Sequence, residues 1–314
     1  MTMNQSSTTL GLLGATGAIG RSIAAAMTEP FRVIGRDKAK LDAEFGGNPL
    51  ASSAPCDPSA AKALAEAFAG LDTVVHLIGV PYHRFKLHPK LMKTAVKAAR
   101  AAGVKRLLLI GTLYPFGKAQ AARIAADHPR APHTFKGRMR KAQEDILMES
   151  GFEWSILRLP DFYGPGVASS LIHDIFVAAA EGRKANVIGP VDVPHEFAFV
   201  PDVGPVVAKL LATPEAFGHA WNLGGVGTIT QREIARMAFG GEPRLMIANK
   251  LMLRLAGLFS PMMREMVEMH HLMTDPLIVD DSALTRLIGP IAKTSYADGV
   301  AQCMTEAKAA RKTG

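Results

Sequence analysis

The sequence is poor in the features that mark a secreted, membrane-spanning or disordered chain. Its two cysteines among 314 residues, Cys56 and Cys303, show no metal-binding or redox spacing, which is typical of a reducing compartment. No apolar run approaches the roughly 18 residues that a spanning helix needs, because Arg254 interrupts the best candidate, Leu251–Phe259. Met1–Thr9 lacks the basic start and apolar core of a signal peptide. Hydrophobic residues make up 48%, which predicts a folded globular protein. From the cysteine usage and the N-terminus, we expect it to be cytoplasmic.

Acidic residues are missing from one long segment of a chain whose net charge is +8. Between Thr73 and Ala126 there is no Asp or Glu, but there are ten Lys or Arg residues. At helical spacing, five of these bases form one face: Lys86, Lys90, Lys93, Lys97 and Arg100. Such a face is either a solvated helix surface or a positive field that attracts an anionic cofactor, an anionic substrate or, weakly, a membrane surface. Aromatic residues number only 6% and do not interleave with these bases, so we expect no nucleic-acid partner.

Short apolar runs alternate with helical segments through the first half of the chain. The expected strands are Leu10–Leu13, Phe31–Gly35, Leu50–Ala54, Thr73–Ile78, Val104–Ile110 and Trp154–Leu159. The expected helices are Ala18–Met27, a segment after Asp37, Pro58–Phe68, Lys86–Ala102 and Thr134–Ser150. This alternation predicts an α/β fold with a Rossmann-type, doubly wound parallel sheet covered on both faces.

A glycine pattern directly follows the first expected strand. Gly14, Gly17 and Gly20 are spaced three apart and open the first helix. Glycines in this place let the chain turn tightly, let backbone N–H groups approach a pyrophosphate and let the helix pack on the strand. The helix N-terminus adds partial positive charge. The alternative is a tight turn without a ligand. We predict a phosphate-binding loop, with contacts from Gly14, Thr16, Gly17, Ala18 and Ile19.

The end of the second expected strand predicts which dinucleotide binds. An acidic residue there favours a free ribose 2′-hydroxyl, whereas an arginine favours a 2′-phosphate. Arg36 stands at this position, and Asp37 can cap the helix that follows. We therefore predict NADP rather than NAD. The alternative is that Arg36 is a solvated surface charge and that Asp37 turns back to a ribose.

The regular alternation of expected strands and helices ends after Pro160. A helix is expected over Leu171–Glu181, strands over Phe197–Val200 and Ala220–Leu223, and a last helix over Tyr296–Arg311. We predict a dinucleotide-binding domain over residues 1–160, to which the later strands within 197–223 return. A smaller, mainly helical substrate region would then span residues 161–196 and 224–291, followed by a C-terminal helix within 292–314.

A methionine stripe lies in the predicted substrate region. It comprises Met262, Met263, Met266, Met269 and Met273. At helical spacing, such a stripe favours core packing or a subunit contact, so a homodimer is one hypothesis. A pliable wall for an apolar substrate is the alternative. The only adjacent histidines, His270 and His271, point in different directions on a helix, so we expect no metal site.

The spacing from Gly14 onward, with several later motifs, resembles the short-chain dehydrogenase/reductase superfamily in its extended and atypical branches. Within that superfamily it is similar to the NAD-dependent epimerase/dehydratase group. The resemblance covers nearly the whole chain and also rests on Asp72–Gly79, Leu109–Gly117, Leu157–Gly166, Phe199–Val203 and Trp221–Gly225. It implies a Ser or Thr with a catalytic role at the end of the fifth strand, where Thr112 falls. It further implies cofactor contacts from Asp57, Leu77, Gly79, Thr112, Pro160 and Tyr163.

The chain departs from this family at its catalytic dyad, which is usually Tyr-x3-Lys on the helix after the fifth strand. Aligned on Glu144, Lys136 takes the place of the tyrosine and Arg140 that of the lysine, and the other register puts Pro132 at the tyrosine position. Two segments have the dyad's spacing elsewhere, Tyr82–Lys86 and Tyr114–Lys118. We interpret both as coincidences of spacing, although their tyrosines can still point into the pocket.

The pattern Lys-x3-Arg-x3-Glu over Lys136, Arg140 and Glu144 is similar to that of the isoflavone-reductase-like atypical reductases, which use a lysine near the nicotinamide. Four residues advance a helix by about 400°, so these side chains drift only about 40° per step. Lys136 and Arg140 can therefore face the cofactor together, Lys136 to exchange a proton and Arg140 to bind ribose hydroxyls. The alternative is a solvated basic helix in which Glu144 bridges Arg140.

The combined pattern predicts an NADP-dependent oxidoreductase acting on a carbonyl or conjugated alkene of a small or medium organic substrate. Thr112 would stabilise the oxyanion, and Lys136 would supply the proton or positive charge. Tyr114 or Tyr163 is the next candidate proton donor. Two alternatives stay open. One is a nucleotide-sugar epimerase- or dehydratase-like enzyme, and the other is a non-catalytic NADPH-binding regulatory or assembly module, which the missing tyrosine favours.

Overall fold

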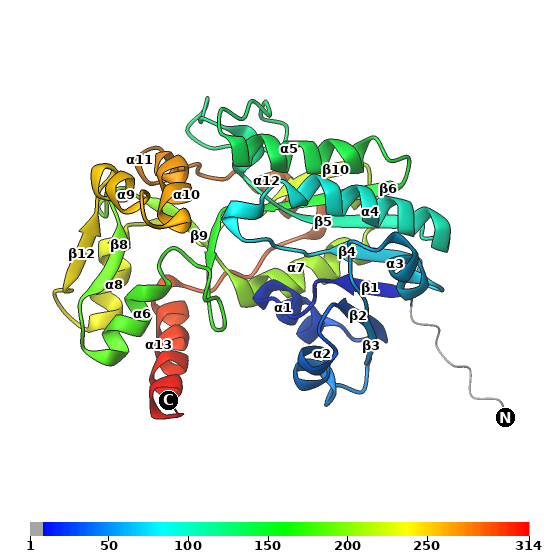
Figure 1. The fold of residues 1–314 in the computed structure, drawn as a ribbon, viewed down its shortest axis with the longest axis horizontal. Helices are drawn as coiled ribbons and strands as arrows, with labels where there is room; N and C mark the ends of the chain where they lie inside the picture. The colour runs from blue at the N-terminus through cyan, green and yellow to red at the C-terminus, as the bar shows by residue number, and fades with distance from the viewer. Residues whose placement is uncertain (1–8, 314) are drawn as a thin grey trace. The chain divides into compact units, whose positions relative to one another are not determined.

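The apolar runs of the first half form one seven-stranded sheet in the computed structural model, which describes residues 9–313 (Figure 1). The strand order is β10-β6-β5-β4-β1-β2-β3, and the neighbouring pairs from β5 to β3 are parallel. The strands are β1 (Leu10–Leu13), β2 (Phe31–Gly35), β3 (Ala51–Pro55), β4 (Thr73–His76), β5 (Arg106–Thr112), β6 (Glu153–Leu159) and β10 (His219–Asn222). The sheet grows outward in both directions from β1 and β4, so the predicted doubly wound Rossmann-type fold is confirmed.

Helices cover both faces of this sheet. They are α1 (Ala18–Ala26), α2 (Lys38–Phe45), α3 (Ala61–Phe68), α4 (Leu87–Ala102), α5 (Phe135–Met148) and α7 (Val200–Ala212). On one face, α3, α4 and α5 lie side by side over a core that includes Leu64, Met92 and Leu147. The basic side chains of α4 lie on its exposed side, as the sequence predicts.

On the other face, α7 packs closely against α1. The amide of Gly204 donates to the Ser22 hydroxyl over 3.0 Å. A Cβ atom added to Gly204 would lie 2.1 Å from the Ser22 carbonyl oxygen. Only a glycine allows the two backbones to approach this closely, so a residue late in the sequence helps to complete the first half of the fold.

The later strands only partly return to the large sheet. β10 joins it beside β6, as predicted. The strand expected at Phe197–Val200 is instead β9 (His195–Phe199), which pairs with β7 (Asp161–Tyr163) and β11 (Thr228–Ile229) in a separate three-stranded sheet. This corrects the prediction. All five residues of β9 are buried, so an apolar run alone could not indicate which sheet it joins.

Smaller elements complete the described chain. A two-stranded parallel pair consists of β8 (Ala185–Ile188) and β12 (Leu245–Ala248). The remaining helices are α6 (His173–Glu181), α8 (Gln231–Phe239), α9 (Lys250–Ala256), α10 (Pro261–Met269), α11 (His271–Thr274), α12 (Ser282–Ile288) and α13 (Tyr296–Thr313). Three short 3-10 turns are η1 (Tyr82–Arg84), η2 (Tyr114–Phe116) and η3 (Pro214–Ala216). None of the helices in the described residues is both long and apolar enough to cross a membrane.

The chain divides into two compact units that interleave in sequence. The first unit comprises the chain up to Pro115 with Phe135–Arg158 and Val203–Trp221, and the second comprises the rest. The predicted first domain, residues 1–160, includes 116–134, which the structure groups with the second unit. The second unit has its own core, built around Tyr163, Phe176 and Phe197. From the methionine stripe, Met266 and Met273 are buried, while the side chains of Met262 and Met269 lie outside the described residues.

Candidate functional site

The glycine turn between β1 and α1 has the geometry of a phosphate-binding loop. Gly14 has a positive φ of 92°, and a Cβ atom there would lie 3.1 Å from the backbone nitrogen of Ile78. At Gly20 a Cβ atom would lie 2.2 Å from the Ala15 carbonyl oxygen, so α1 can pack on the turn only without a side chain. Gly17 is exposed at the N-cap of α1, whose first turn contains no acidic residue. The open helix N-terminus therefore fits an anionic group.

The ends of β2 and β3, the two strands that follow β1 in the sheet, each carry a charged side chain. Arg36 and Asp57 are both exposed, each following its strand. Hydrogen bonds from Ser59 lower the pKa of Asp57, and the charge of Arg36 adds to this effect. The Asp37 carboxylate accepts the Lys40 amide over 3.1 Å and caps α2, as the sequence predicts. Asp37 is thus engaged by its own helix, which leaves Arg36 as the charged group open at this strand end.

The chain that leaves β4 lies against the glycine turn. The Leu77 amide donates to the Leu13 carbonyl over 2.8 Å, and Leu77 is half-buried while Gly79 is exposed. Thr16, Ala18 and Ile19 are half-buried around the start of α1. The residues present at this edge of the sheet therefore fit a dinucleotide. Backbone N–H groups of the glycine turn suit the pyrophosphate. Arg36 supplies a cation at the end of β2, and Gly79 leaves the backbone open after β4.

A second cluster forms where β4 and β5 end, around Lys136 of α5. Lys136 is 0% exposed. Its Nζ atom lies 5.8 Å from the ring centroid of Tyr82 and 5.9 Å from that of Phe85, within the range of a cation–π contact. The interpretation of this helix as a solvated basic face is therefore wrong for Lys136, because aromatic rings cover its ammonium group.

Two tyrosines meet beside this lysine. The hydroxyls of Tyr82 in η1 and Tyr114 in η2 lie 3.4 Å apart. The ring of Phe85 stacks with both, at centroid distances of 5.4 Å and 6.3 Å. Neither tyrosine forms a dyad with the lysine four residues on, because Lys86 lies over the Phe135 ring instead and Lys118 is exposed. The spacing was a coincidence, but the tyrosines do converge on one site.

The Arg140 side chain is buried beside this site and does not face the solvent. It is 7% exposed, and its guanidinium donates to the Gln143 side chain at 2.7 Å, His88 Nδ1 at 3.0 Å, the Ile110 carbonyl at 3.3 Å and Thr112 Oγ1 at 3.4 Å. Burial lowers its pKa to about 10. The prediction that Arg140 binds ribose hydroxyls is thereby corrected, since four of its five N–H groups are used inside the unit. Arg140 is a positioning residue for Thr112.

Glu144 pairs with Arg158 of β6, and its charge also acts on Arg140 one turn away. The two side chains make parallel hydrogen bonds of 2.9 Å, and each is 2% exposed. Such a bidentate pair holds α5 in a fixed position on the sheet. The same helix carries Lys136, so this ion pair sets where the lysine lies.

Two buried histidines in this cluster were not predicted from the sequence. Burial, and then the charge of Arg140, lowers the pKa of His76 to about 4 and that of His88 to about 2. His88 accepts from Arg140 through Nδ1, so it is neutral with its proton on Nε2. A histidine within the otherwise apolar stripe of α4 was the available signal, since a buried polar side chain needs a partner.

Two residues predicted to contact the cofactor lie in the second unit and are buried. Tyr163 is 1% exposed, with its ring among Phe176, Phe197, Phe199 and Tyr296. Burial raises the pKa of its phenol. Alternation along β7 turns this ring into the core of the second unit, so the predicted cofactor contact of Tyr163 is not used in the proposed function. Pro160 is buried at the junction of β6 and β7.

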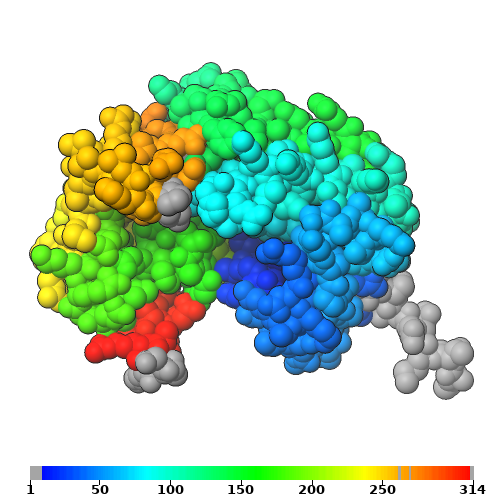
Figure 2. Space-filling model, viewed as in Figure 1, coloured from blue at the N-terminus to red at the C-terminus, as the bar shows by residue number. Residues whose placement is uncertain are grey.

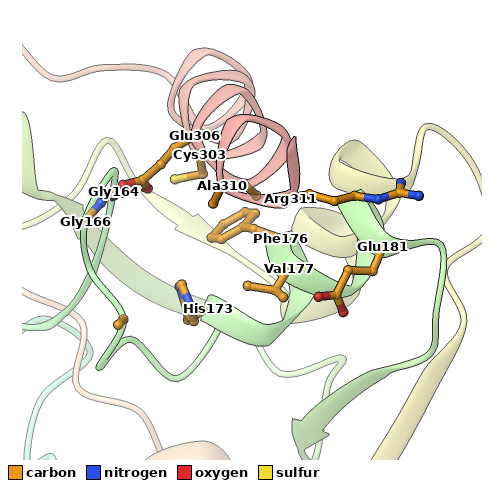
Figure 3. Close-up of a pocket in the computed structure, with 12 residues that line it drawn as sticks. Gly164, Gly166, His173, Phe176, Val177, Glu181, Cys303, Glu306, Ala310 and Arg311 are labelled. Carbon is orange, nitrogen blue, oxygen red and sulfur yellow. Dashed lines mark hydrogen bonds between the residues drawn. The ribbon is translucent and has the colours of Figure 1, made fainter. Parts of the chain in front are cut away.

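A pocket of about 520 Å³ lies within the second unit, between α6 and α13 (Figure 3). Its walls are mainly apolar, with Phe176, Val177 and Ala310 among them. Two of its polar side chains are engaged by the fold: Glu306 accepts the Gly166 amide at 2.8 Å, and Arg311 donates to the Ala180 carbonyl at 2.6 Å. None of the predicted site residues lines it.

Comparisons with known proteins agree with this geometry. Residues 14–169 match the family model described as NAD(P)H-binding. A search of curated proteins finds no match. Among solved structures, the fold is similar to DesIV, a dTDP-glucose 4,6-dehydratase from Streptomyces venezuelae with NAD and TYD bound (TM-score 0.81, 18% identity, 98% of each chain covered). It is also similar to a UDP-glucuronic acid 4-epimerase from Bacillus cereus with NAD (TM-score 0.79, 15% identity, 96% of this chain and 99% of that one). A third is the enzyme WbmH of Bordetella bronchiseptica with NAD+ (TM-score 0.75, 21% identity, 95% and 98%).

Proposed function

We propose that this chain is an NADP-dependent oxidoreductase of the short-chain dehydrogenase/reductase type, a proposal supported by the match of residues 14–169 to the NAD(P)H-binding family model and by the Rossmann-type sheet. Its substrate would be a small or medium organic molecule with a carbonyl or a conjugated alkene. The observation that carries this proposal is the convergence of Thr112, Tyr82, Tyr114 and Lys136 at the ends of β4 and β5.

In this proposal the cofactor is held by the glycine turn of residues 14–20, by Arg36 and by Asp57. When bound, the nicotinamide supplies or accepts the hydride. The chain's own residues bind the reacting oxygen and handle the proton. Since Thr112 Oγ1 already accepts from Arg140, its O–H group is oriented to donate to a developing oxyanion.

The proton comes from the tyrosine pair rather than from a tyrosine on α5. Tyr114 holds a proton on its hydroxyl oxygen, and the Tyr82 hydroxyl at 3.4 Å can replace it. The ammonium of Lys136, 5.8 Å from the ring centroid of Tyr82, places a positive charge beside the phenols, where negative charge develops when Tyr114 gives up its proton. Lys136 thus supplies the positive charge that the sequence predicts for it, but acts through the phenols.

The preference for NADP rests on Arg36 and is directly testable. Arg36→Ala should weaken NADPH binding about tenfold or more, because a charge-assisted contact contributes roughly 1.5–3 kcal/mol, and should leave NADH binding nearly unchanged. Fluorescence titration of both nucleotides against both proteins measures this. Lys40→Ala is the matched control, since Lys40 is also an exposed cation close in sequence on α2. Equal affinity of the unaltered protein for NADPH and NADH would contradict the proposal.

A second candidate is an enzyme acting on a sugar nucleotide. It is favoured by the similarity of the fold, over at least 95% of each chain, to enzymes named as a dTDP-glucose dehydratase and a UDP-glucuronic acid epimerase. The two candidates separate in one assay series. NADPH oxidation is followed with aldehydes, ketones, enones and quinones, and dTDP-glucose and UDP-glucuronic acid are followed for conversion without net oxidation. Binding of NADPH with no turnover in either arm, together with altered association with another protein, would favour the regulatory module instead.

A further inference from the structure

The second unit presents an unusual amount of apolar surface on α9 and the turn after it. Five large apolar side chains there are exposed by 46% or more: Leu251, Met252, Leu255, Leu258 and Phe259. Phe259 is 91% exposed. Figure 2 shows this segment, in gold, at the surface. Contiguous apolar side chains in water mark an interaction surface.

These side chains are held on an ordered hairpin rather than on a loose loop. The turn is closed by amide hydrogen bonds from Gly257 to Leu253 at 2.8 Å, from Phe259 to Ala256 at 3.1 Å and from Ser260 to Ala256 at 2.9 Å. The Arg264 side chain donates twice to the Gly257 carbonyl, at 3.1 and 3.2 Å, and so ties α10 to the end of α9. A surface ordered in advance binds a partner without a further cost in conformational entropy.

The side chains of α9 and the following turn fall into three sets: buried, exposed basic and exposed apolar. Leu253 and Gly257 are buried and point inward. At about 100° per residue, Lys250 and Arg254 flank this inward side. Leu251 and Leu255 share the outward side of α9, and Leu258 is exposed in the turn after it. A helix lying in a membrane interface has this arrangement, with apolar side chains among the lipid tails and basic groups at headgroup level.

Charge indicates what covers this surface. From Lys250 to Ser260, which covers α9 and the turn after it, the chain has two basic residues, Lys250 and Arg254, and no acidic one, whereas α10 carries Arg264 with Glu265 and Glu268. A two-fold contact with a second copy would place the same basic face against itself, which opposes pairing. Anionic lipid headgroups attract such a face, by about 1 kcal/mol for each basic residue near the surface.

We propose that the α9–α10 hairpin, residues 250–264, docks this protein onto an anionic lipid surface. Leu258 and Phe259 at its tip enter the headgroup region, and Lys250 and Arg254 contact the lipid phosphates. The contact is peripheral, and it does not depend on the proposed oxidoreductase activity.

Co-sedimentation with vesicles tests this proposal on the full chain. The probes are vesicles of phosphatidylcholine alone and of phosphatidylcholine with phosphatidylglycerol at about 3:1. We expect at least roughly tenfold tighter binding to the anionic vesicles. Leu258→Ser with Phe259→Ser should weaken that binding about tenfold or more, through lost apolar burial. Lys250→Glu with Arg254→Glu should abolish the preference for anionic lipid.

Two matched controls locate the effect. Met237→Ser and Val226→Ser remove apolar side chains of similar exposure, 45% and 46%, outside the hairpin, and should leave binding unchanged. Lys93→Glu with Lys97→Glu tests the basic face of α4, and an equal loss of binding there would overturn the assignment to the hairpin.

No binding of the unaltered protein to anionic vesicles would overturn the proposal itself. So would a hairpin variant that, in sedimentation velocity, only converts a dimer to a monomer, because the surface would then be a subunit contact.

Discussion

Lys136→Met is expected to lower turnover by about 10²–10³-fold, the usual effect of removing one group that stabilises charge in the transition state, while NADPH still binds. Methionine keeps the length and the apolar stem under the rings of Tyr82 and Phe85, but it removes the ammonium charge. The phosphate contacts of residues 14–20 and Arg36 belong to other elements, so nucleotide fluorescence should be unchanged. The measurement is NADPH oxidation with the best substrate of the panel, alongside nucleotide titration.

The matched control is Lys141→Met on the same helix. Lys141 pairs with Asp145 at 2.8 Å and is 36% exposed, so its loss should leave turnover near the original rate. Tyr114→Phe separates the lysine from the phenols: it removes the proposed proton and leaves the charge. Turnover by Lys136→Met at the unaltered rate would refute the role of Lys136 and leave Tyr114 as the remaining proton donor in this cluster.

Arg158→Met is expected to lower the free energy of unfolding by about 3–5 kcal/mol, because it leaves the charge of Glu144 buried without its partner. Both side chains are 2% exposed and share two hydrogen bonds of 2.9 Å. Urea unfolding followed by circular dichroism measures the change. The double variant Glu144→Gln with Arg158→Met should recover part of the loss, since neither buried charge remains.

Arg232→Met provides the contrast for this ion pair. Arg232 makes hydrogen bonds of 2.6 and 2.9 Å to Asp192, but Asp192 is 65% exposed. An exposed pair contributes only about 0–1 kcal/mol, so this variant should unfold close to the original midpoint. If Arg158→Met and Arg232→Met had equal effects, the Glu144–Arg158 pair would have to be solvated, contrary to its burial.

The cofactor edge of the sheet could be predicted because its signals are local. The spacing of Gly14, Gly17 and Gly20 indicates a turn and a helix start within seven residues, and Asp37 as a cap is a matter of adjacent positions. The doubly wound order follows from the alternation of strands and helices. Each of these signals involves neighbours in sequence, so no tertiary contact had to be known.

The cluster of Tyr82, Tyr114 and Lys136 was only half predictable because its contacts are not local. Tyr82 and Tyr114 are 32 residues apart and meet because β4 and β5 are parallel neighbours whose exits lie at one edge. Sequence spacing tested each tyrosine against the lysine four residues on, and so did not indicate that Tyr82 lies beside Lys136. For Tyr163 the sequence signal was local, but the contacts of the ring are not. Its motif resembles a cofactor loop, whereas strand alternation turns the ring into the core of the second unit.

Two contacts described above affect how the chain folds during synthesis. Gly204 packs on Ser22, and β10 joins the sheet beside β6. The first unit needs residues 203–221, so its sheet stays open at the β6 edge, and α1 stays uncovered, until about two-thirds of the chain has left the ribosome. A fragment ending at Pro160 would therefore expose an unpaired strand edge and an apolar helix face, both of which promote aggregation. The dinucleotide-binding half is consequently not a detachable module, and fragments made to study cofactor binding alone should extend through Asn222.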